Sequence, residues 1–290
     1  MAAVGIIGLG IMGSAYARHL IDAGLDVRGA DPAPEARARL TEMGGAAHEA
    51  PGDWLTGCDL VILSLASPSA LSTVAGQLAG LLTQGQVVMD TGTFALPDKE
   101  AARDVLAAKG IEMLDCTVSG TGAQAAVKDL VLMASGAETA KAVAMRYIPH
   151  FTRKVIDAGA FGGGSKLKYI ANLVVTIHNT AAAEALNYSR RMGLDDDVVY
   201  ELLSTGAGQS KMLDLRMPLM ISGAYDPPTA SMTMFEKDLS IIGGDLKRLG
   251  VSAPLFEACV ALYDQASKVI PPDTSDAAAV YEAYRVTDKH

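Results

Sequence analysis

Two groups of residues in this 290-residue chain have types and spacing suited to chemistry, and the first is a glycine-rich run. Gly8-Leu9-Gly10-Ile11-Met12-Gly13 follows an apolar run and opens a helical pattern. In such a setting the first glycine permits a tight turn, the second lets the backbone approach a pyrophosphate, and the third allows close helix–strand packing. Amides at the helix N-terminus donate to phosphate oxygens. The run therefore predicts a dinucleotide-binding site.

Asp31 is the residue that would select the dinucleotide, since it ends the next apolar run, 18 residues after Gly13. A carboxylate there can accept hydrogen bonds from both ribose hydroxyls and would repel a 2′-phosphate, so it favours NAD over NADP. The alternative is that Asp31 only forms the turn before Pro32. Arg28 and Arg37 are near enough to weaken the exclusion of NADP, and we interpret them as solvated surface charges.

The second group lies in Gly162-x-Gly164-x-x-x-Lys168-x-x-x-Asn172. Lys168 and Asn172 are four residues apart, so on a helix they share one face near its N-terminal end. A lysine on an otherwise apolar helix is costly to bury unless it has a chemical role or a partner, and a structural ion pair would also satisfy it. Lys166 lies about 200° away around the helix and is expected at the surface.

Two different hydrophobic periods indicate the elements that position these residues. Through about residue 160, short apolar runs alternate with helical patterns such as Ser14–Ala23 and Pro97–Lys109, which predicts a Rossmann-type, doubly wound α/β sheet. The expected strands are Val4–Ile7, Val27–Ala30, Leu60–Leu65, Val87–Asp90, Met113–Cys116, Leu130–Ala134 and Val155–Asp157.

Beyond about residue 165 the β-rich runs nearly vanish, and an all-helical domain is expected. Its helices are predicted at Ser165–Met192, Asp195–Leu203, Met234–Leu249, Pro254–Ser267 and Asp276–Tyr284. We therefore expect an NAD-binding domain over residues 1–162. An all-α domain for substrate binding and dimerisation is expected over 163–290, beginning with a long interdomain helix.

Composition excludes several classes of protein. The chain is 50% hydrophobic and 20% charged, as packed soluble proteins are, and 24 basic against 33 acidic residues give a net charge of −9. Such a surface argues against nucleic acid or an anionic membrane as the main partner. The longest charge-free apolar stretch, Tyr169–Ala183, is shorter than the ~20 residues that span a bilayer.

Cysteine and histidine usage predicts a reducing compartment and no metal site. Cys58, Cys116 and Cys259 are odd in number and far apart, as buried free thiols of a cytoplasmic protein are. The five histidines form no HxxxH pair, so we expect no bound metal. The strand pattern begins by Ala3 and leaves no room for a signal peptide.

Four motifs in order make the sequence resemble the β-hydroxyacid dehydrogenase family, which includes 3-hydroxyisobutyrate, tartronate-semialdehyde and threonate-type enzymes. The resemblance covers essentially the whole chain. Besides the glycine run and the segment from Gly162 to Asn172, it rests on a D-x-P-V-S-G-like and a KDL-like segment: Asp115-Cys116-Thr117-Val118-Ser119-Gly120 and Met234-Phe235-Glu236-Lys237-Asp238-Leu239. It implies hydride transfer between nicotinamide C4 and the carbon that bears the alcohol or carbonyl.

The resemblance also implies a role for each site residue. Lys168 would exchange a proton with the substrate oxygen, and Asn172 would hold that oxygen by a hydrogen bond. The substrate carboxylate would be bound by Ser119 and by the backbone amides of Gly120 and Thr121. Thr93 would contact the cofactor, and Lys237 would close over the nicotinamide side.

Proton exchange near neutral pH requires a lowered pKa for Lys168. Desolvation, the positive nicotinamide and Lys237 would lower this pKa, and a bound carboxylate would oppose them. We therefore expect alcohol oxidation to be fastest at an alkaline pH of about 8 to 10.

Three departures from the family pattern bear on the substrate. Thr121 stands where many members have glycine, a common glycine is replaced within Lys128-Asp129-Leu130, and Ala171 replaces the first asparagine of a frequent pair. Thr121 adds a methyl and a hydroxyl to the pocket, and β-branched residues rarely adopt positive φ. These changes argue against simple 3-hydroxyisobutyrate. The stretches His178–Ala185 and Met133–Gly136 look more like the threonate-type branch, so a four-carbon sugar acid is favoured.

Two other functions stay open at this point. One is an imine or ketone reductase of the same fold, which usually lacks the lysine at position 168. The other is an NAD-binding module without catalysis, against which the presence of Lys168 and Asn172 argues. The apolar surface of the long helix further favours a homo-oligomer, a dimer or a tetramer.

Overall fold

The computed structural model describes residues 3–287, and the chain divides into two compact units, Met1–Lys168 and Tyr169–His290. We call them the sheet unit and the helical unit. The division falls within helix α7 (Gly163–Arg191), whereas the domain boundary expected from the sequence lies at residue 162, just ahead of that helix.

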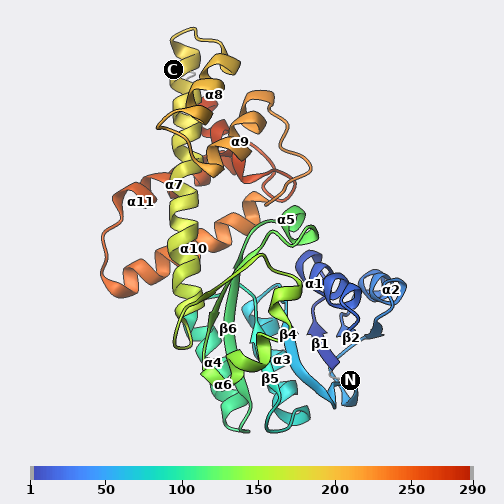
Figure 1. Cartoon of the computed structure of the whole chain (residues 1–290). Coiled ribbons are helices and arrows are strands. Elements are labelled where there is room, and N and C mark those ends of the chain that lie inside the picture. Colours follow the sequence, from blue (N-terminus) through green and yellow to red (C-terminus); the bar gives the residue numbers. More distant parts are fainter. Residues whose placement is uncertain (1–2, 288–290) are drawn as a thin grey trace. The chain divides into compact units, whose positions relative to one another are not determined.

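The sheet unit is built on an eight-stranded sheet with the strand order β3-β2-β1-β4-β5-β6-β7-β8 (Figure 1). Neighbouring strands run parallel except β6 and β7, which are antiparallel. The strands are β1 Ala3–Ile7, β2 Asp26–Ala30, β3 Ala46–His48, β4 Cys58–Leu63, β5 Val87–Asp90, β6 Glu112–Ser119, β7 Val131–Ser135 and β8 Lys154–Asp157. The predicted doubly wound sheet is confirmed. The sequence does not predict β3, because three residues with no large apolar side chain show no strand period.

Helices cover both faces of this sheet, and alternate residues of the central strands enter two separate cores. Val4 and Ile6 of β1 pack with α1 and α2, whereas Ala3 and Ile7 pack with α3 and α4. This alternation explains why the strand is apolar throughout, since a parallel sheet is buried on both faces. The helices of the unit are α1 Ile11–Asp22, α2 Pro34–Glu42, α3 Pro68–Leu81, α4 Leu96–Ala107, α5 Gly122–Ala126 and α6 Glu138–Ala144.

The helical unit packs around a third core, to which α7 contributes Tyr169, Ala182, Ala183 and Leu186. It continues with α8 Asp196–Thr205, α9 Lys211–Ser222, α10 Met232–Leu249, α11 Pro254–Ala266, a 3-10 turn Ala277–Tyr281 and α12 Glu282–Thr287. The predicted helical second half is confirmed. The sequence does not predict α9, because Pro218 lies inside it and proline usually ends a helical pattern. None of the described helices is both long and apolar enough to cross a membrane.

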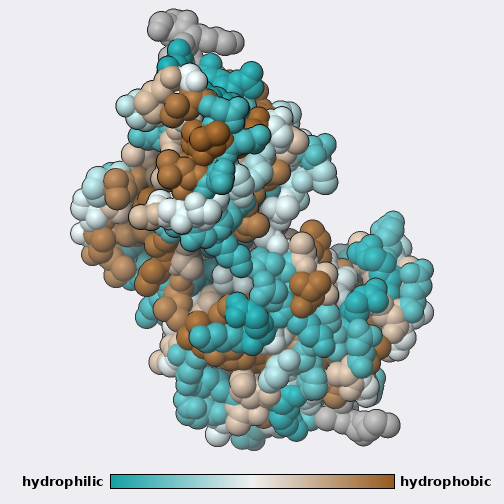
Figure 2. Space-filling model, turned by 45° about the horizontal axis from the view of Figure 1, so that its top comes forward, coloured by the Kyte–Doolittle hydropathy of each residue, from teal (hydrophilic) through white to brown (hydrophobic). Residues whose placement is uncertain are grey.

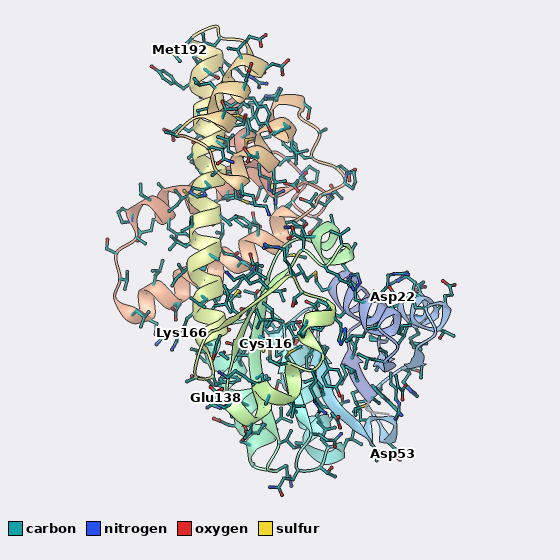
Figure 3. The ribbon with its side chains drawn as sticks, in the orientation of Figure 1. Asp22, Asp53, Cys116, Glu138, Lys166 and Met192 are labelled. Atoms are coloured by element: carbon teal, nitrogen blue, oxygen red, sulfur yellow. The ribbon has the colours of Figure 1, made fainter. Side chains whose placement is uncertain are left out.

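One side of α7 leaves apolar side chains exposed. Leu167, Ile170, Val174 and Tyr188 are exposed, and they fall on one helical stripe because they are spaced three, four and fourteen residues apart. Figure 2 shows such apolar side chains as brown patches on the molecular surface. Figure 3 labels Lys166 near the start of α7 and Met192 just past its end.

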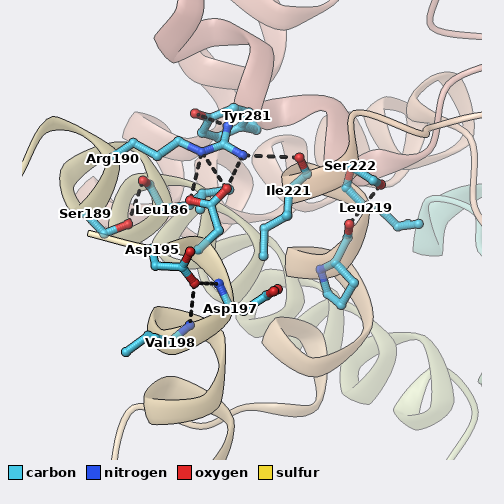
Figure 4. Close-up of polar contacts among 12 residues, drawn as sticks. Leu186, Ser189, Arg190, Asp195, Asp197, Val198, Leu219, Ile221, Ser222 and Tyr281 are labelled. Carbon is cyan, nitrogen blue, oxygen red and sulfur yellow. Dashed lines mark hydrogen bonds and ion pairs between the residues drawn. The ribbon is translucent and has the colours of Figure 1, made fainter. Parts of the chain in front are cut away.

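Arg190 fastens the end of α7 within the helical unit (Figure 4). Its Nη2 lies 2.6 Å from Asp196 Oδ2, and its Nη1 donates to the hydroxyl of Tyr281 at 2.9 Å. Nη2 also donates to the carbonyl of Ile221 at 3.2 Å. One guanidinium thus joins α7, α8, the end of α9 and the C-terminal 3-10 turn.

Candidate active site

Two of the three glycines in the loop after β1 are required by the fold itself. Gly8 has φ +92°, and a Cβ there would lie 2.2 Å from the carbonyl oxygen of Ser64. A Cβ on Gly13 would lie 1.9 Å from the carbonyl oxygen of Gly8. Both distances are far below van der Waals contact, so these glycines fix the turn and bring α1 against the sheet.

Gly10 is different, because nothing in the described part of the protein requires glycine there. Its φ of −66° suits any residue, and a Cβ would meet no atom within 4 Å. This open space lies directly at the N-terminus of α1, where unpaired amides and the helix dipole attract an anion. The loop therefore fits a pyrophosphate that approaches the backbone so closely that a Cβ would be in the way.

Asp31 lies at the end of β2, beside the glycine loop. Its Oδ2 accepts a hydrogen bond from the amide of Leu9 at 2.7 Å, and its Oδ1 accepts one from the amide of Ala33 at 2.8 Å. The carboxylate is therefore oriented by the loop itself. Arg28 pairs with Asp26 at 2.7 Å, and Arg37 donates to the carbonyl of Asp31 at 2.9 Å.

The predicted substrate loop, Ser119 to Thr121, joins β6 to α5. Gly120 has φ +140°, and a Cβ there would lie 2.5 Å from Leu130 Cδ2, so glycine is needed. Thr121 has an ordinary φ of −94° and caps α5. Its amide donates to Gln124 Oε1 at 3.0 Å, and its hydroxyl accepts from the Gln124 amide at 3.4 Å. The threonine is therefore unstrained, and its amide would have to leave Gln124 to bind a carboxylate.

The glycine loop and the substrate loop lie next to each other. A Cβ on Gly122 would come within 2.6 Å of Ile11 Cγ2, and the Ile11 side chain is 74% exposed. Behind them, His19 Nε2 of α1 lies 2.8 Å from the carbonyl oxygen of Ala125 in α5. Thr93 lies in the turn after β5, at the same edge of the parallel strands, where ligands of such sheets bind.

Lys168 lies in the second turn of α7 and is half-buried, whereas Lys166 is exposed as predicted. The glycines before it allow the helix to begin against the sheet. A Cβ on Gly164 would lie 2.6 Å from the carbonyl oxygen of Asp115 and 2.7 Å from that of Met133. Gly162 has φ +90°, which favours glycine. This is the physical reason for the Gly162-x-Gly164 pattern.

In the helical unit, Asn172 lies beside a carboxylate that the sequence does not single out as a site residue. Asn172 Nδ2 donates to Asp238 Oδ2 at 2.7 Å, and the Asn172 side chain is buried. Lys237 Nζ lies 3.3 Å from Asp238 Oδ1. Asp238 thus connects the two predicted site residues of this unit. The available signal was a carboxylate adjacent to Lys237 in the KDL-like segment.

The three cysteines are free and buried, as predicted. Burial raises the pKa of Cys116 far above its ordinary value, and the nearby Asp115 adds to this, so Cys116 is no nucleophile despite its place in the D-x-P-V-S-G-like segment. Among residues 3–287, no three His, Cys, Asp or Glu side chains are grouped so that they could hold a metal ion.

Two protein-family models match the chain. One, described as the NAD binding domain of 6-phosphogluconate dehydrogenase, matches residues 3–159. The other, described as "NAD-binding of NADP-dependent 3-hydroxyisobutyrate dehydrogenase", matches residues 162–284. Together they cover both units, and both descriptions name a nicotinamide cofactor.

Individual proteins are similar over nearly the whole length. L-threonate dehydrogenase of Cupriavidus necator is 32% identical over 281 residues, which cover 96% of this chain and 94% of that protein. The crystal structure of a 3-hydroxyisobutyrate dehydrogenase from Salmonella typhimurium has a TM-score of 0.87 at 30% identity and covers 97% of this chain and 99% of its own. An imine reductase from Pseudomonas sp. shares the fold, with a TM-score of 0.61 at 16% identity, 97% of this chain and 99% of that one being covered.

Proposed function

Because the chain belongs to the β-hydroxyacid dehydrogenase family and is thus an NAD(P)-dependent oxidoreductase, we propose that it transfers a hydride between NAD and a small β-hydroxy acid or its semialdehyde. We propose a four-carbon sugar acid as the preferred substrate. The observation that carries the proposal is the open space over Gly10 beside an oriented Asp31. The names of several similar relatives, L-threonate dehydrogenases, support the substrate class.

In this proposal the chain's own residues bind the acid and handle its proton, and the bound nicotinamide supplies or accepts the hydride. Lys168 takes the hydroxyl proton during oxidation and returns it during reduction. Asn172 uses one N–H of its Nδ2 on Asp238, so its second N–H and its Oδ1 are left to hydrogen-bond the substrate oxygen. Ser119, Gly120 and Thr121 bind the substrate carboxylate, with Thr121 exchanging its bond to Gln124 for one to the substrate.

Lys237 and Thr93 complete the proposed site on the cofactor side. Lys237, whose Nζ lies 3.3 Å from Asp238 Oδ1, closes over the nicotinamide side in this proposal. We expect the oxidation rate with NAD to rise with pH toward an optimum of about 8 to 10, as a lysine that must lose its proton to act as a base requires.

The direct test of the function is Lys168→Ala, assayed with L-threonate and NAD by NADH absorbance. We expect kcat to fall on the order of a thousandfold while the Kd for NADH stays within about twofold, because only proton exchange is lost. Lys166→Ala, two residues away and exposed, is the matched control and should keep its kcat. Retention of most of kcat in Lys168→Ala would refute the assignment.

The preference for NAD is tested by Asp31→Ser. Without the carboxylate, the repulsion of a 2′-phosphate disappears, and kcat/KM with NADP should rise about tenfold relative to NAD. Asp26→Ser removes an exposed carboxylate at the other end of the same strand and serves as control. Equal use of both cofactors by the unaltered protein would contradict the preference.

We also propose that the protein is a homo-oligomer, a dimer or a tetramer, in which a second copy covers the exposed apolar stripe of α7. Leu167, Ile170 and Val174 are too large and too close together to be isolated surface residues. Light scattering should give a multiple of 30.1 kDa, and Ile170→Asp should lower it. A monomer at micromolar concentration would exclude this assembly.

A further inference from the structure

A fully buried lysine in the sheet unit is bonded to two fully buried carboxylates. Lys99 of α4 places its Nζ 2.8 Å from Asp90 Oδ2 at the end of β5 and 2.6 Å from Asp115 Oδ1 in β6. All three side chains are 0% exposed. Burying such charges is expensive and is no advantage for stability over apolar packing. The cluster therefore calls for an explanation in terms of what else its members hold.

The carboxylate of Asp115 holds the first turn of α7. Its Oδ2 accepts from the amide of Ser165 at 2.8 Å, and its Oδ1 accepts from the Ser165 hydroxyl at 3.0 Å. Thr117, two residues on in β6, donates its hydroxyl to the carbonyl of Gly164 at 2.7 Å. Ser165 is one helical turn before Lys168, so these contacts determine where the Lys168 side chain begins.

The carboxylate of Asp90 holds the turn that carries Thr93. Its Oδ1 accepts from the amide of Gly92 at 3.3 Å. Thr91 is fixed to the neighbouring strand, since its amide and its hydroxyl both donate to the carbonyl of Leu63, at 3.0 and 2.8 Å. Thr93 is the residue after Gly92. Lys99, by bonding to both carboxylates, links this turn to the start of α7.

Lys99 is a fixed charge and not a proton carrier. Burial alone would lower its pKa, but the two carboxylates outweigh burial and hold this pKa well above the ordinary value. Burial raises the pKa of Asp90, and the attraction of Lys99 opposes that rise. Without Lys99, two buried carboxylates would face each other with no positive charge between them.

We propose that Lys99 is a positioning residue that ties the turn carrying Thr93 to the first turn of α7, and so fixes Lys168 relative to the cofactor side. Asp90 and Asp115 are the two arms of this connection. The inference rests on the proposed roles of Thr93 and Lys168. It gives Asp90, Lys99 and Asp115 a part in aligning the reacting groups, and because all three side chains are fully buried they act through other residues and not on the substrate.

Separate substitution of the two arms tests the proposal. Asp115→Asn loosens the α7 arm and should lower kcat about 10- to 100-fold with L-threonate and NAD, because small displacements of a catalytic group have such effects. Its Kd for NADH should stay within about twofold. Asp90→Asn loosens the other arm and should weaken NADH binding on the order of fivefold. Both variants moving the same parameter to the same extent would overturn the proposal.

A readout without turnover is hydrogen exchange of the backbone amides. Asp115→Asn should raise exchange in residues 163–169 about tenfold or more, and Asp90→Asn should do so in residues 91–95. Lys99→Met should raise exchange in both segments. Unchanged protection of both segments would overturn the proposal even if no substrate is turned over.

Milder variants guard against loss of the fold. Thr117→Val and Ser165→Ala each remove one hydroxyl that holds the first turn of α7. Thr117→Ser keeps the hydroxyl and should therefore show the exchange and kcat of the unaltered protein. The matched control is Thr152→Val, which removes another buried hydroxyl that donates to the carbonyl of Ile148 at 2.9 Å, away from α7. Equal effects of Thr117→Val and Thr152→Val on kcat and exchange would overturn the proposal.

Lys168→Ala, assayed in parallel, separates the two failures. If Lys168→Ala keeps its kcat, the proposed function is wrong. The exchange data then still show whether Asp90, Lys99 and Asp115 hold the two segments in place. If Lys168→Ala is inactive while Asp115→Asn keeps both kcat and protection of residues 163–169, the positioning role is wrong and the proposed function stands.

Discussion

Each unit of the molecule buries a charged cluster, and the two clusters hold different things. In the sheet unit, Lys99 bonds to Asp90 and Asp115. In the helical unit, Arg216 of α9 is paired with Asp276, and both side chains are more than nine-tenths buried. The Asp276 carboxylate also accepts from the Thr229 hydroxyl at 2.8 Å and the Ala278 amide at 2.9 Å.

The two clusters differ in which groups, besides the lysine or arginine, donate hydrogen bonds to the buried carboxylates. Those of the sheet-unit cluster belong to the turn before Thr93 and to the first turn of α7, which carry proposed site residues. Those of Asp276 belong to the segment between α9 and α10, which supplies Thr229 and Ala230, and to the C-terminal 3-10 turn, which supplies Ala278. Burial of charge alone therefore does not mark function; the elements that the charged groups fasten decide it.

The largest effect is expected from Lys99→Met, which leaves two buried carboxylates without a counter-charge. We expect the free energy of unfolding at pH 8 to fall by about 5 kcal/mol. The loss should depend on pH. Burial already raises the pKa of Asp90 in the folded state, and removing Lys99 raises it further. Such a carboxyl favours the fold below its unfolded pKa of about 3.9, and this contribution is lost as pH rises through the folded pKa.

Urea unfolding at several pH values between 5 and 8 measures this slope. As the Asp90 carboxyl ionises, the variant should lose stability with rising pH by up to ~1.4 kcal/mol per pH unit, more steeply than the unaltered protein. Lys99→Met combined with Asp90→Asn should flatten the curve. Parallel curves for the variant and the unaltered protein would show that Lys99 does not neutralise the cluster.

A smaller effect, on stability alone, is expected from Asp276→Ala in the helical unit. Leaving Arg216 buried without its partner should cost about 3 kcal/mol of unfolding free energy. The kcat measured well below the unfolding midpoint should not change. As control, Asp245→Ala breaks the pair with the exposed Arg248, 2.6 Å long, and should cost less than about 0.5 kcal/mol. A large fall in kcat for Asp276→Ala would remove the distinction between the clusters.

The smallest effect concerns a strained position in the sheet unit that holds no buried charge. Lys128, two residues past α5, has φ +62°, a left-handed conformation that costs an L-residue about 1 kcal/mol. Lys128→Gly relieves this strain but adds freedom to the unfolded chain, so we expect a net gain of about 0.5 kcal/mol. Lys154→Gly in β8 should instead lose stability, and thermal unfolding distinguishes the two. A loss for Lys128→Gly would mean that the lysine side chain itself contributes.

The strained lysine also explains one departure from the family pattern noted in the sequence. A glycine common in the family is replaced within Lys128–Leu130, and the structure gives Lys128 the positive φ for which glycine is suited. Thr121, by contrast, replaces a glycine without strain, because its φ is −94°. The sequence alone could not separate these two cases, since φ is set by the capping of α5.

What the sequence predicted of the structure is local. The turn at the glycine run, the place of Asp31 at the end of a strand and the helix that carries Lys168 depend on neighbours within one strand–turn–helix or one helical turn, so spacing is enough to predict them. What the sequence did not predict depends on partners far apart in the chain, or on local preferences that the tertiary structure overrides, as Pro218 inside α9 shows. Lys99 meets Asp115 across 16 residues and Asp115 meets Ser165 across 50, and no periodicity links them. Asp238 stands in the KDL-like segment, but only its hydrogen bond to Asn172, 66 residues away, connects it with that residue.

At Gly10, selection for a stable fold and selection for cofactor binding have different requirements. Because its φ is ordinary and a Cβ there would point into open space, an alanine costs the fold nothing and should even restrict the unfolded chain. Because the fold of the Gly10→Ala variant is intact, chaperones and proteases that act on unfolded chains would not remove it. In the proposed role of Gly10, the variant would fold normally, yet it would lose the gain in stability that the bound cofactor confers. An assay that measures only the amount of folded protein would not detect such an inactive variant.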